Sequence, residues 1–320
     1  MKRRPLLTKI ILLGVLAWFA WVLYVGRDEV DSLLTGARWD IAALSIVVLT
    51  AANAFAGVIY ASCMGTGSDV RKKRMVIIGA FLLSQLAKYL PGRIWGIVMQ
   101  VGLLDMPGAS ARVLSANLEL VLANLIIVTG VGVAALCGVY AGTITAVAML
   151  SVFAVIAAGA LRYRLADRFI HCLCRRFPSL ARRLRLDVQD ESLLASEIRS
   201  ARSMDGLRSA GLLVAYAFCY ALGWGLLIVA LLDMPEAHAF GVLAVMSLSH
   251  LVGVVSLLPG GVGARELSMV LLAPAVESAT SQMVLLAAAS RAAILLVDAV
   301  GALIGWGAMA FGSQGSEHHV

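Results

Sequence analysis

The chain has 320 residues, of which 61% are hydrophobic and 14% are charged, and its mean hydropathy is +0.91. Soluble domains carry about 25% charged residues, so this composition argues against a soluble fold and predicts a polytopic membrane protein. The net charge of +7 does not indicate nucleic-acid binding, because the basic residues fall in short segments between apolar runs, where they set membrane topology.

Apolar runs of roughly 17 to 25 residues predict the membrane spans. The first predicted span covers residues 8–25, follows the basic Met1–Arg4, and is not expected to be cleaved. Further spans are predicted at 41–61, 113–136, 141–160, 209–232, 239–257 and 282–310. Two broken regions interrupt the series, at 75–104 and from 258 to about 275. The sequence therefore predicts one all-α integral membrane domain over 1–320, with about seven or eight transmembrane helices and two broken or re-entrant helical elements.

Basic residues predict the orientation of the chain. They cluster before the first span, at Arg71–Arg74, and in a polar insert at 161–208 that holds eleven arginines. The positive-inside rule places all three segments, and hence the N-terminus, on the cytoplasmic side of the cytoplasmic (inner) membrane. Residues 75–104 must then enter and leave on the same side. Each arm, at about 15 residues, is roughly 22 Å long and too short for a 30 Å hydrocarbon core, which favours a re-entrant hairpin over two short full spans.

The insert at 161–208 alternates arginines with leucine, phenylalanine and isoleucine. This pattern predicts amphipathic helices lying on the inner leaflet. A solvated linker whose arginines only set the topology is the alternative.

Leu-Pro-Gly stands at the centre of both broken regions, at Leu90–Gly92 and at Leu258–Gly260. Proline removes a helical hydrogen bond and glycine loosens the backbone, so each helix should stop at its Leu-Pro-Gly. Gly261 and Gly263 extend the second break, and Gly260, Gly261 and Gly263 all permit positive φ angles and close backbone approach. Backbone freed at membrane depth is tolerated only where it is buried in protein or lines a wet cavity.

Charged residues beside both breaks predict an anion site. Lys88 and Arg93 flank the first break, and Arg265 and Glu266 follow the second. A half-helix that begins after Pro-Gly directs unpaired N–H groups into the break, and a neighbouring arginine can hold a phosphate with paired donors. A lipid phosphate is the anion expected at this depth. The alternative is structural, with Arg265 and Glu266 bound to neighbouring side chains and the arginines reaching the interface.

Three further charges, Glu119, Arg291 and Asp298, lie inside apolar spans. Arg291 and Asp298 are seven residues apart and so face the same side of the last helix. Glu119 needs a partner, for which Arg93 and Arg291 are the candidates, and a purely structural ion pair is the alternative. The predicted substrate-binding residues are Lys88, Pro91, Gly92, Arg93, Glu119, Pro259, Gly260, Gly261, Gly263, Arg265, Glu266, Arg291 and Asp298.

The segments Lys-Tyr-Leu-Pro-Gly-Arg-Ile-Trp at 88–95 and Leu-Pro-Gly-Gly-Val-Gly-Ala-Arg-Glu at 258–266 resemble the lysylphosphatidylglycerol synthase transmembrane-domain family, also called flippase-like. Ala264 stands where valine is common in the family. In enzymes of the family this region moves the lipid product between leaflets, while a separate soluble C-terminal domain transfers the amino acid. The resemblance implies the translocating part, so the chain is not expected to be an enzyme. Stand-alone members look associated with envelope glycolipid or polyprenyl-lipid pathways.

These observations predict a flippase-like protein that binds an anionic phospholipid or polyprenyl-linked glycolipid and translocates it across the membrane, with no cofactor, metal site or catalytic residue. One alternative is a non-transporting partner of an envelope-lipid or glycan enzyme, with an envelope glycosyltransferase as the candidate partner. Another is a membrane transferase acting on a polyprenyl phosphate. It would have to take its base from Glu119, Glu266 or His250.

Overall fold

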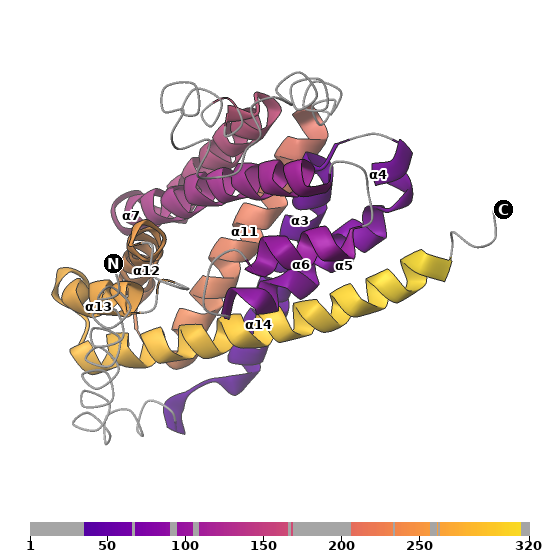
Figure 1. Cartoon of the computed structure of the whole chain (residues 1–320). Helices are drawn as coiled ribbons and strands as arrows, with labels where there is room; N and C mark the ends of the chain where they lie inside the picture. The colour runs from indigo at the N-terminus through magenta and orange to yellow at the C-terminus, as the bar shows by residue number, and fades with distance from the viewer. Residues whose placement is uncertain are drawn as a thin grey trace, which may run out of the picture. The chain divides into compact units, whose positions relative to one another are not determined.

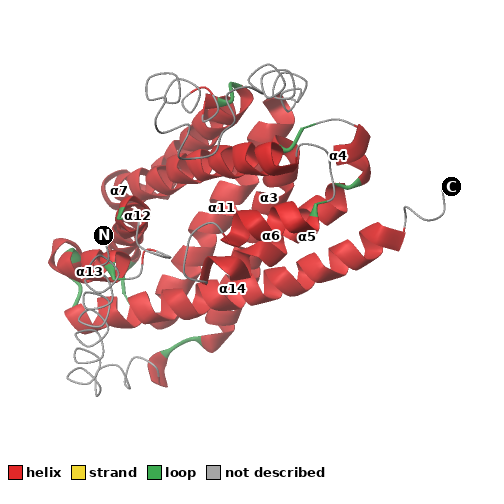
Figure 2. Ribbon diagram, viewed as in Figure 1, coloured by secondary structure: helices red, strands yellow, loops and turns green. Residues whose placement is uncertain are grey.

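The computed structural model describes residues 35–65, 68–89, 95–104, 109–165, 168, 206–232, 234–256, 261 and 263–314. These residues form helices and no strand (Figures 1 and 2). Five of the helices are long and apolar enough to cross a membrane: α3 (Trp39–Cys63), α7 (Ala109–Arg162), α11 (Gly206–Leu231), α12 (Glu236–Val255) and α14 (Thr280–Gln314). The prediction of an all-α polytopic membrane protein is confirmed. The total of seven or eight spans stays a prediction, because 8–25 lies outside the described residues, as does most of the insert at 161–208.

Helix α7 consists of two arms that meet at Gly142 (Figure 1). The backbone of Gly142 has φ 80° and ψ 175°, which lies outside the helical region. A residue with a side chain is strained at such a φ, so glycine suits this position. The break falls at the boundary between the predicted spans 113–136 and 141–160.

The chain divides into two compact units. Unit 1 contains residues up to Leu49 together with Val128–Leu150 and Phe218–Val297, and unit 2 contains Thr50–Ile127, Ser151–Ala217 and the residues from Asp298 onward. Helices α3, α7, α11 and α14 contribute residues to both units. Each unit contains one of the two broken elements that the sequence predicts.

The first broken element lies in unit 2 and consists of α5 (Arg74–Ser84), the 3₁₀-helix η1 (Gln85–Tyr89) and α6 (Trp95–Leu103), preceded by the short α4 (Ser68–Lys72). Gln100 Nε2 on α6 donates to Ser84 Oγ at 2.7 Å, and a Cβ at Gly96 would lie 3.5 Å from the Ser84 carbonyl oxygen. Two successive turns of α6 therefore lie beside the end of α5, so the chain has turned back on itself. The nine described residues of α6 span roughly 14 Å. Whether residues 75–104 form a re-entrant hairpin or two short spans stays a prediction.

The second broken element lies in unit 1 and consists of α12, α13 (Ala264–Leu271) and the 3₁₀-helix η4 (Ala273–Val276). Gly253, near the end of α12, approaches Gly261, and Gly241, near its start, approaches Val276. This pairing of late with early positions makes α12 antiparallel to the segment that follows it. Gly261 has φ 65°, and a Cβ there would lie 2.9 Å from the Gly253 Cα atom, so the tip is closed by contact between two backbones.

A buried hydrogen-bond network attaches the first hairpin to its neighbours in unit 2. The Gln100 side-chain oxygen accepts hydrogen bonds from Tyr60 Oη at 2.8 Å and from Asn117 Nδ2 at 2.7 Å. Tyr60 is fully buried on α3 and also stacks on Phe81. Buried polar groups are costly unless they are paired, so these bonds hold α6 against α3 and α7 in one register.

Glycines also bring α5 and α14 into backbone contact within unit 2. A Cβ at Gly79 would lie 2.5 Å from the Gly305 carbonyl oxygen, and one at Gly305 would lie 2.7 Å from the Gly79 carbonyl oxygen. The hydrophobic effect does not drive helices together inside a bilayer, so they associate through close packing. Small residues at the crossing allow that packing.

We expect Gly305→Ala to lower the free energy of unfolding by about 1–3 kcal/mol, because the added methyl group forces two backbones apart. The measurement is the unfolding of the purified protein in detergent. Gly307→Ala is the matched control on the same helix, since no atom lies within 4 Å of its Cβ position. Equal stabilities for the two variants would show that α5 and α14 do not touch at Gly79.

Candidate functional site

The second break ends in a helix start whose cap is supplied by a charged side chain. Gly263 precedes α13 with φ 88°, and its N–H donates to Glu266 Oε2 at 2.8 Å. This bond satisfies one of the N–H groups that a helix start leaves open, and it fixes the Glu266 carboxylate beside the break. Gly261 and Gly263 both have positive φ angles, of 65° and 88°, which glycine permits.

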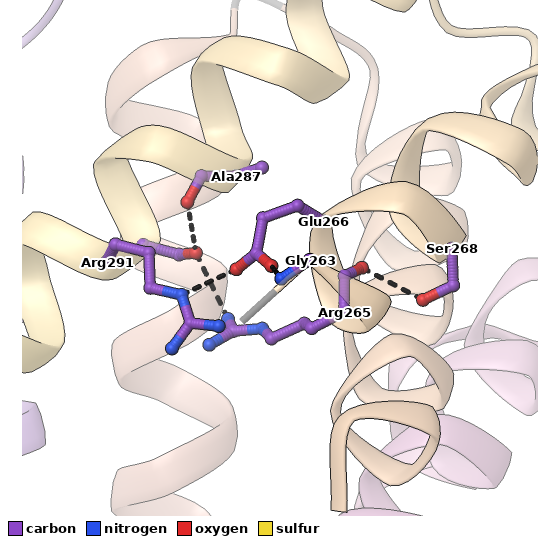
Figure 3. Close-up of polar contacts among 7 residues, drawn as sticks. Gly263, Arg265, Glu266, Ser268, Ala287 and Arg291 are labelled. Atoms are coloured by element: carbon purple, nitrogen blue, oxygen red, sulfur yellow. Dashed lines mark hydrogen bonds and ion pairs between the residues drawn. The ribbon is translucent and has the colours of Figure 1, made fainter. Parts of the chain in front are cut away.

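The other oxygen of Glu266 accepts from Arg291 on α14. Arg291 Nε donates to Glu266 Oε1 (Figure 3). Glu266 is only 7% exposed, so it is an ionised group held away from water. Such a group requires a paired charge and hydrogen bonds, and Arg291 together with the Gly263 N–H supplies both.

Arg265 is buried beside this pair and binds no carboxylate. It is 4% exposed, its Nη2 donates to Ser290 Oγ at 3.1 Å, and its Cζ lies 5.7 Å from the centre of the Trp224 ring. Within the described part of the chain Arg265 forms no ion pair, and its buried Nε has no hydrogen-bond partner. Arg291 repels the Arg265 guanidinium electrostatically, and Glu266 attracts it.

The cluster in unit 1 therefore carries excess positive charge. Arg265 and Arg291 contribute two positive charges and Glu266 contributes one negative charge, which leaves a sum of +1. Ionised groups in membrane-spanning segments are costly and usually meet an opposite charge. One bound anion would bring the sum of these three charges to zero.

A second charged pair lies in unit 2, close to the first break. Lys88 Nζ on η1 lies 2.7 Å from Asp298 Oδ2 on α14. The Asp298 side chain is 4% exposed, whereas that of Lys88 is 40% exposed. A buried carboxylate is thus paired with a lysine whose side chain is partly exposed.

Of the other predicted site residues, Glu119 is described by the structure and five are not. Glu119 is buried on the first arm of α7, in unit 2. Arg291, one of its two expected partners, lies in unit 1 and forms an ion pair with Glu266. Outside the described residues lie Pro91, Gly92, Arg93, Pro259 and Gly260.

Sequence reasoning missed two side chains that surround Arg265. Trp224 lies in α11, and Ser290 lies in α14 immediately before Arg291. Tryptophan and serine are common in apolar spans, and neither stands at a distinctive spacing. Only the packing of α11 and α14 against α13 brings them to the guanidinium.

Metal coordination finds no support in the described ranges. No three His, Cys, Asp or Glu side chains there lie close enough together to hold a metal ion. The carboxylates of Glu266 and Asp298 instead lie against Arg291 and Lys88.

Together, the helical hairpins and the buried charges define a multi-pass membrane protein with ionised groups at its helix breaks. A family model described as "Lysylphosphatidylglycerol synthase TM region" matches residues 6–301. The chain belongs to this family, and the resemblance inferred from the two Leu-Pro-Gly motifs is confirmed. No curated protein and no solved structure matches the chain. The family makes it a membrane protein related to lipid chemistry.

We expect Arg291→Met to destabilise the protein by about 3–5 kcal/mol, because it leaves the Glu266 carboxylate buried without this partner. Adding Glu266→Gln should recover much of that loss, since a neutral amide still accepts from the Gly263 N–H. Unfolding of the two single variants and the double variant in detergent gives the coupling energy. Strictly additive effects would mean that the ion pair contributes no coupling.

The pair in unit 2 should respond asymmetrically to substitution. Lys88→Met removes a cation that contacts a buried carboxylate, whereas Asp298→Asn leaves a lysine whose side chain is already 40% exposed at the surface of the protein. We therefore expect a larger fall in thermal midpoint for Lys88→Met than for Asp298→Asn. The reverse order would indicate that Lys88, and not Asp298, depends on the contact.

Proposed function

We propose that the chain binds an anionic lipid at Arg265 and translocates it across the cytoplasmic membrane. The observation that carries this proposal is the buried guanidinium of Arg265, which has no ion pair within the described residues and contributes the excess positive charge of its cluster. A charge of this kind is a functional-site hypothesis by default in a membrane protein.

A phosphate group matches the chemistry around Arg265. Guanidinium N–H groups bind phosphate oxygens in pairs, and α13 starts at Ala264, so its N-terminal dipole adds a favourable partial charge. The Glu266 carboxylate accepts hydrogen bonds from Arg291 and Gly263. N–H groups of Arg265 therefore stay available to a phosphate. The apolar outer surfaces of the spans suit acyl or prenyl chains. An anionic phospholipid and a polyprenyl-linked glycolipid both combine these two chemical parts.

The broken elements suggest a route for the headgroup. Transporters place substrates where helices are interrupted, because unwound backbone and half-helix ends bind polar groups that intact helices cannot reach. Each unit of this chain holds one such element. The exposed basic residues of α4, just before the first hairpin, favour a cytoplasmic location for that end of the hairpin. Movement would be passive or ion-coupled, since the sequence has no ATP-binding motif.

The lipids that co-purify with the protein test the proposal. We expect native mass spectrometry to find a defined anionic lipid on the wild type and to find it lost from Arg265→Ala. The matched control is Arg162→Ala, which removes an exposed arginine at the end of α7. In proteoliposomes, translocation of fluorescent phosphatidylglycerol should fall at least tenfold for Arg265→Ala and stay unchanged for Arg162→Ala, as the loss of one charge-assisted contact requires.

Two outcomes would contradict this function. An unselective lipid profile that Arg265→Ala leaves unchanged would favour a non-transporting partner of an envelope enzyme. Chemical turnover of a polyprenyl phosphate, lost on chelation of metal ions, would favour a transferase.

A further inference from the structure

Two contacts of the Arg265 guanidinium are with uncharged groups. Ser290 Oγ, fully buried, accepts from Arg265 Nη2 at 3.1 Å, and the guanidinium carbon lies 5.7 Å from the Trp224 ring centre. The Ser290 hydroxyl donates its own hydrogen to the Ala287 carbonyl at 2.8 Å, which leaves its lone pairs for Arg265. These contacts orient the guanidinium without cancelling its charge.

Glu266, the carboxylate closest to Arg265 in the sequence, forms its hydrogen bonds with other residues. Glu266 follows Arg265 directly, yet its two oxygens accept from the Gly263 N–H and from Arg291 Nε (Figure 3). A carboxylate at position 290 would form a charge-assisted pair with Arg265 and bring the sum of charges in the cluster from +1 to zero. A hydroxyl at that position sets the direction of the guanidinium and leaves the charge available.

We propose that Ser290 is a positioning residue that sets the preference of this site for anionic ligands. Its hydroxyl orients Arg265, and its lack of charge preserves the positive charge that an anion would meet. This inference rests on the proposed function of Arg265. If Ser290 only stabilised the fold, a carboxylate at position 290 would serve as well or better, because it would give the buried arginine an opposite charge. Substitution by aspartate therefore moves stability and anion binding in different directions.

The test compares Ser290→Asp with Ser290→Asn, which have equal size and differ in charge. The full-length variants are titrated in detergent with phosphatidylglycerol as the anionic probe and diacylglycerol as the uncharged probe, and binding is read by native mass spectrometry. We expect Ser290→Asp to bind phosphatidylglycerol at least about tenfold more weakly than Ser290→Asn, the effect of one lost charge-assisted hydrogen bond. Diacylglycerol binding should be equal, and the thermal midpoint of Ser290→Asp should equal or exceed that of Ser290→Asn.

Equal phosphatidylglycerol affinities of the two variants would overturn the role of Ser290. Arg265→Gln, measured alongside, separates this failure from failure of the proposed function. If Arg265→Gln binds phosphatidylglycerol as tightly as the wild type does, the proposed function is wrong. If Arg265→Gln loses binding while Ser290→Asp and Ser290→Asn agree, only the inference about Ser290 is wrong.

Trp224 provides a second form of the test should neither variant at 290 fold. Trp224→Glu and Trp224→Gln place the same contrast of charge at the aromatic contact of the guanidinium. A gap of at least about tenfold in phosphatidylglycerol affinity is expected between them. Equal affinities would overturn the proposal that uncharged contacts leave the positive charge of Arg265 available to an anion.

Discussion

Ionised side chains beside each helix break are costly unless an opposite charge or hydrogen bonds compensate them, because the bilayer offers neither water nor mobile ions to screen them. Helix α14 supplies that charge to both broken elements. In unit 1 its Arg291 binds Glu266, and in unit 2 its Asp298 binds Lys88. The signs are opposite in the two pairs. α14 therefore offers a cation to one hairpin and an anion to the other, so each hairpin has its own complementary contact.

Backbone contacts constrain the same hairpins more tightly than their apolar side chains do. Gly261 approaches Gly253 at the tip of the second hairpin, and Gly79 approaches Gly305 where α5 crosses α14. Apolar side chains pack almost as well against lipid as against protein, so they select a partner weakly. Close glycine contacts and buried hydrogen bonds such as those of Gln100 select one arrangement, because they require a specific neighbour.

Arg265 differs from the other charges near the breaks in having no opposite charge bound to it within the described residues. The protein surrounds it with a hydroxyl and an aromatic face, while Glu266 is held by Gly263 and Arg291. An arrangement that served stability alone would give the guanidinium a carboxylate. The retained charge distinguishes a site that can receive an anion from an ion pair that only joins two helices.

By itself, the sequence determined the membrane class, the helical fold and the family. Apolar runs, proline and glycine act locally, so their effect can be predicted without knowing the neighbours. Only the tertiary structure decided which charges meet. Arg291 binds Glu266, a pairing that the sequence left open, and Ser290 and Trp224 gave no signal in the sequence. Pairing at membrane depth depends on which helices pack together, and the spacing of residues along one helix does not specify that.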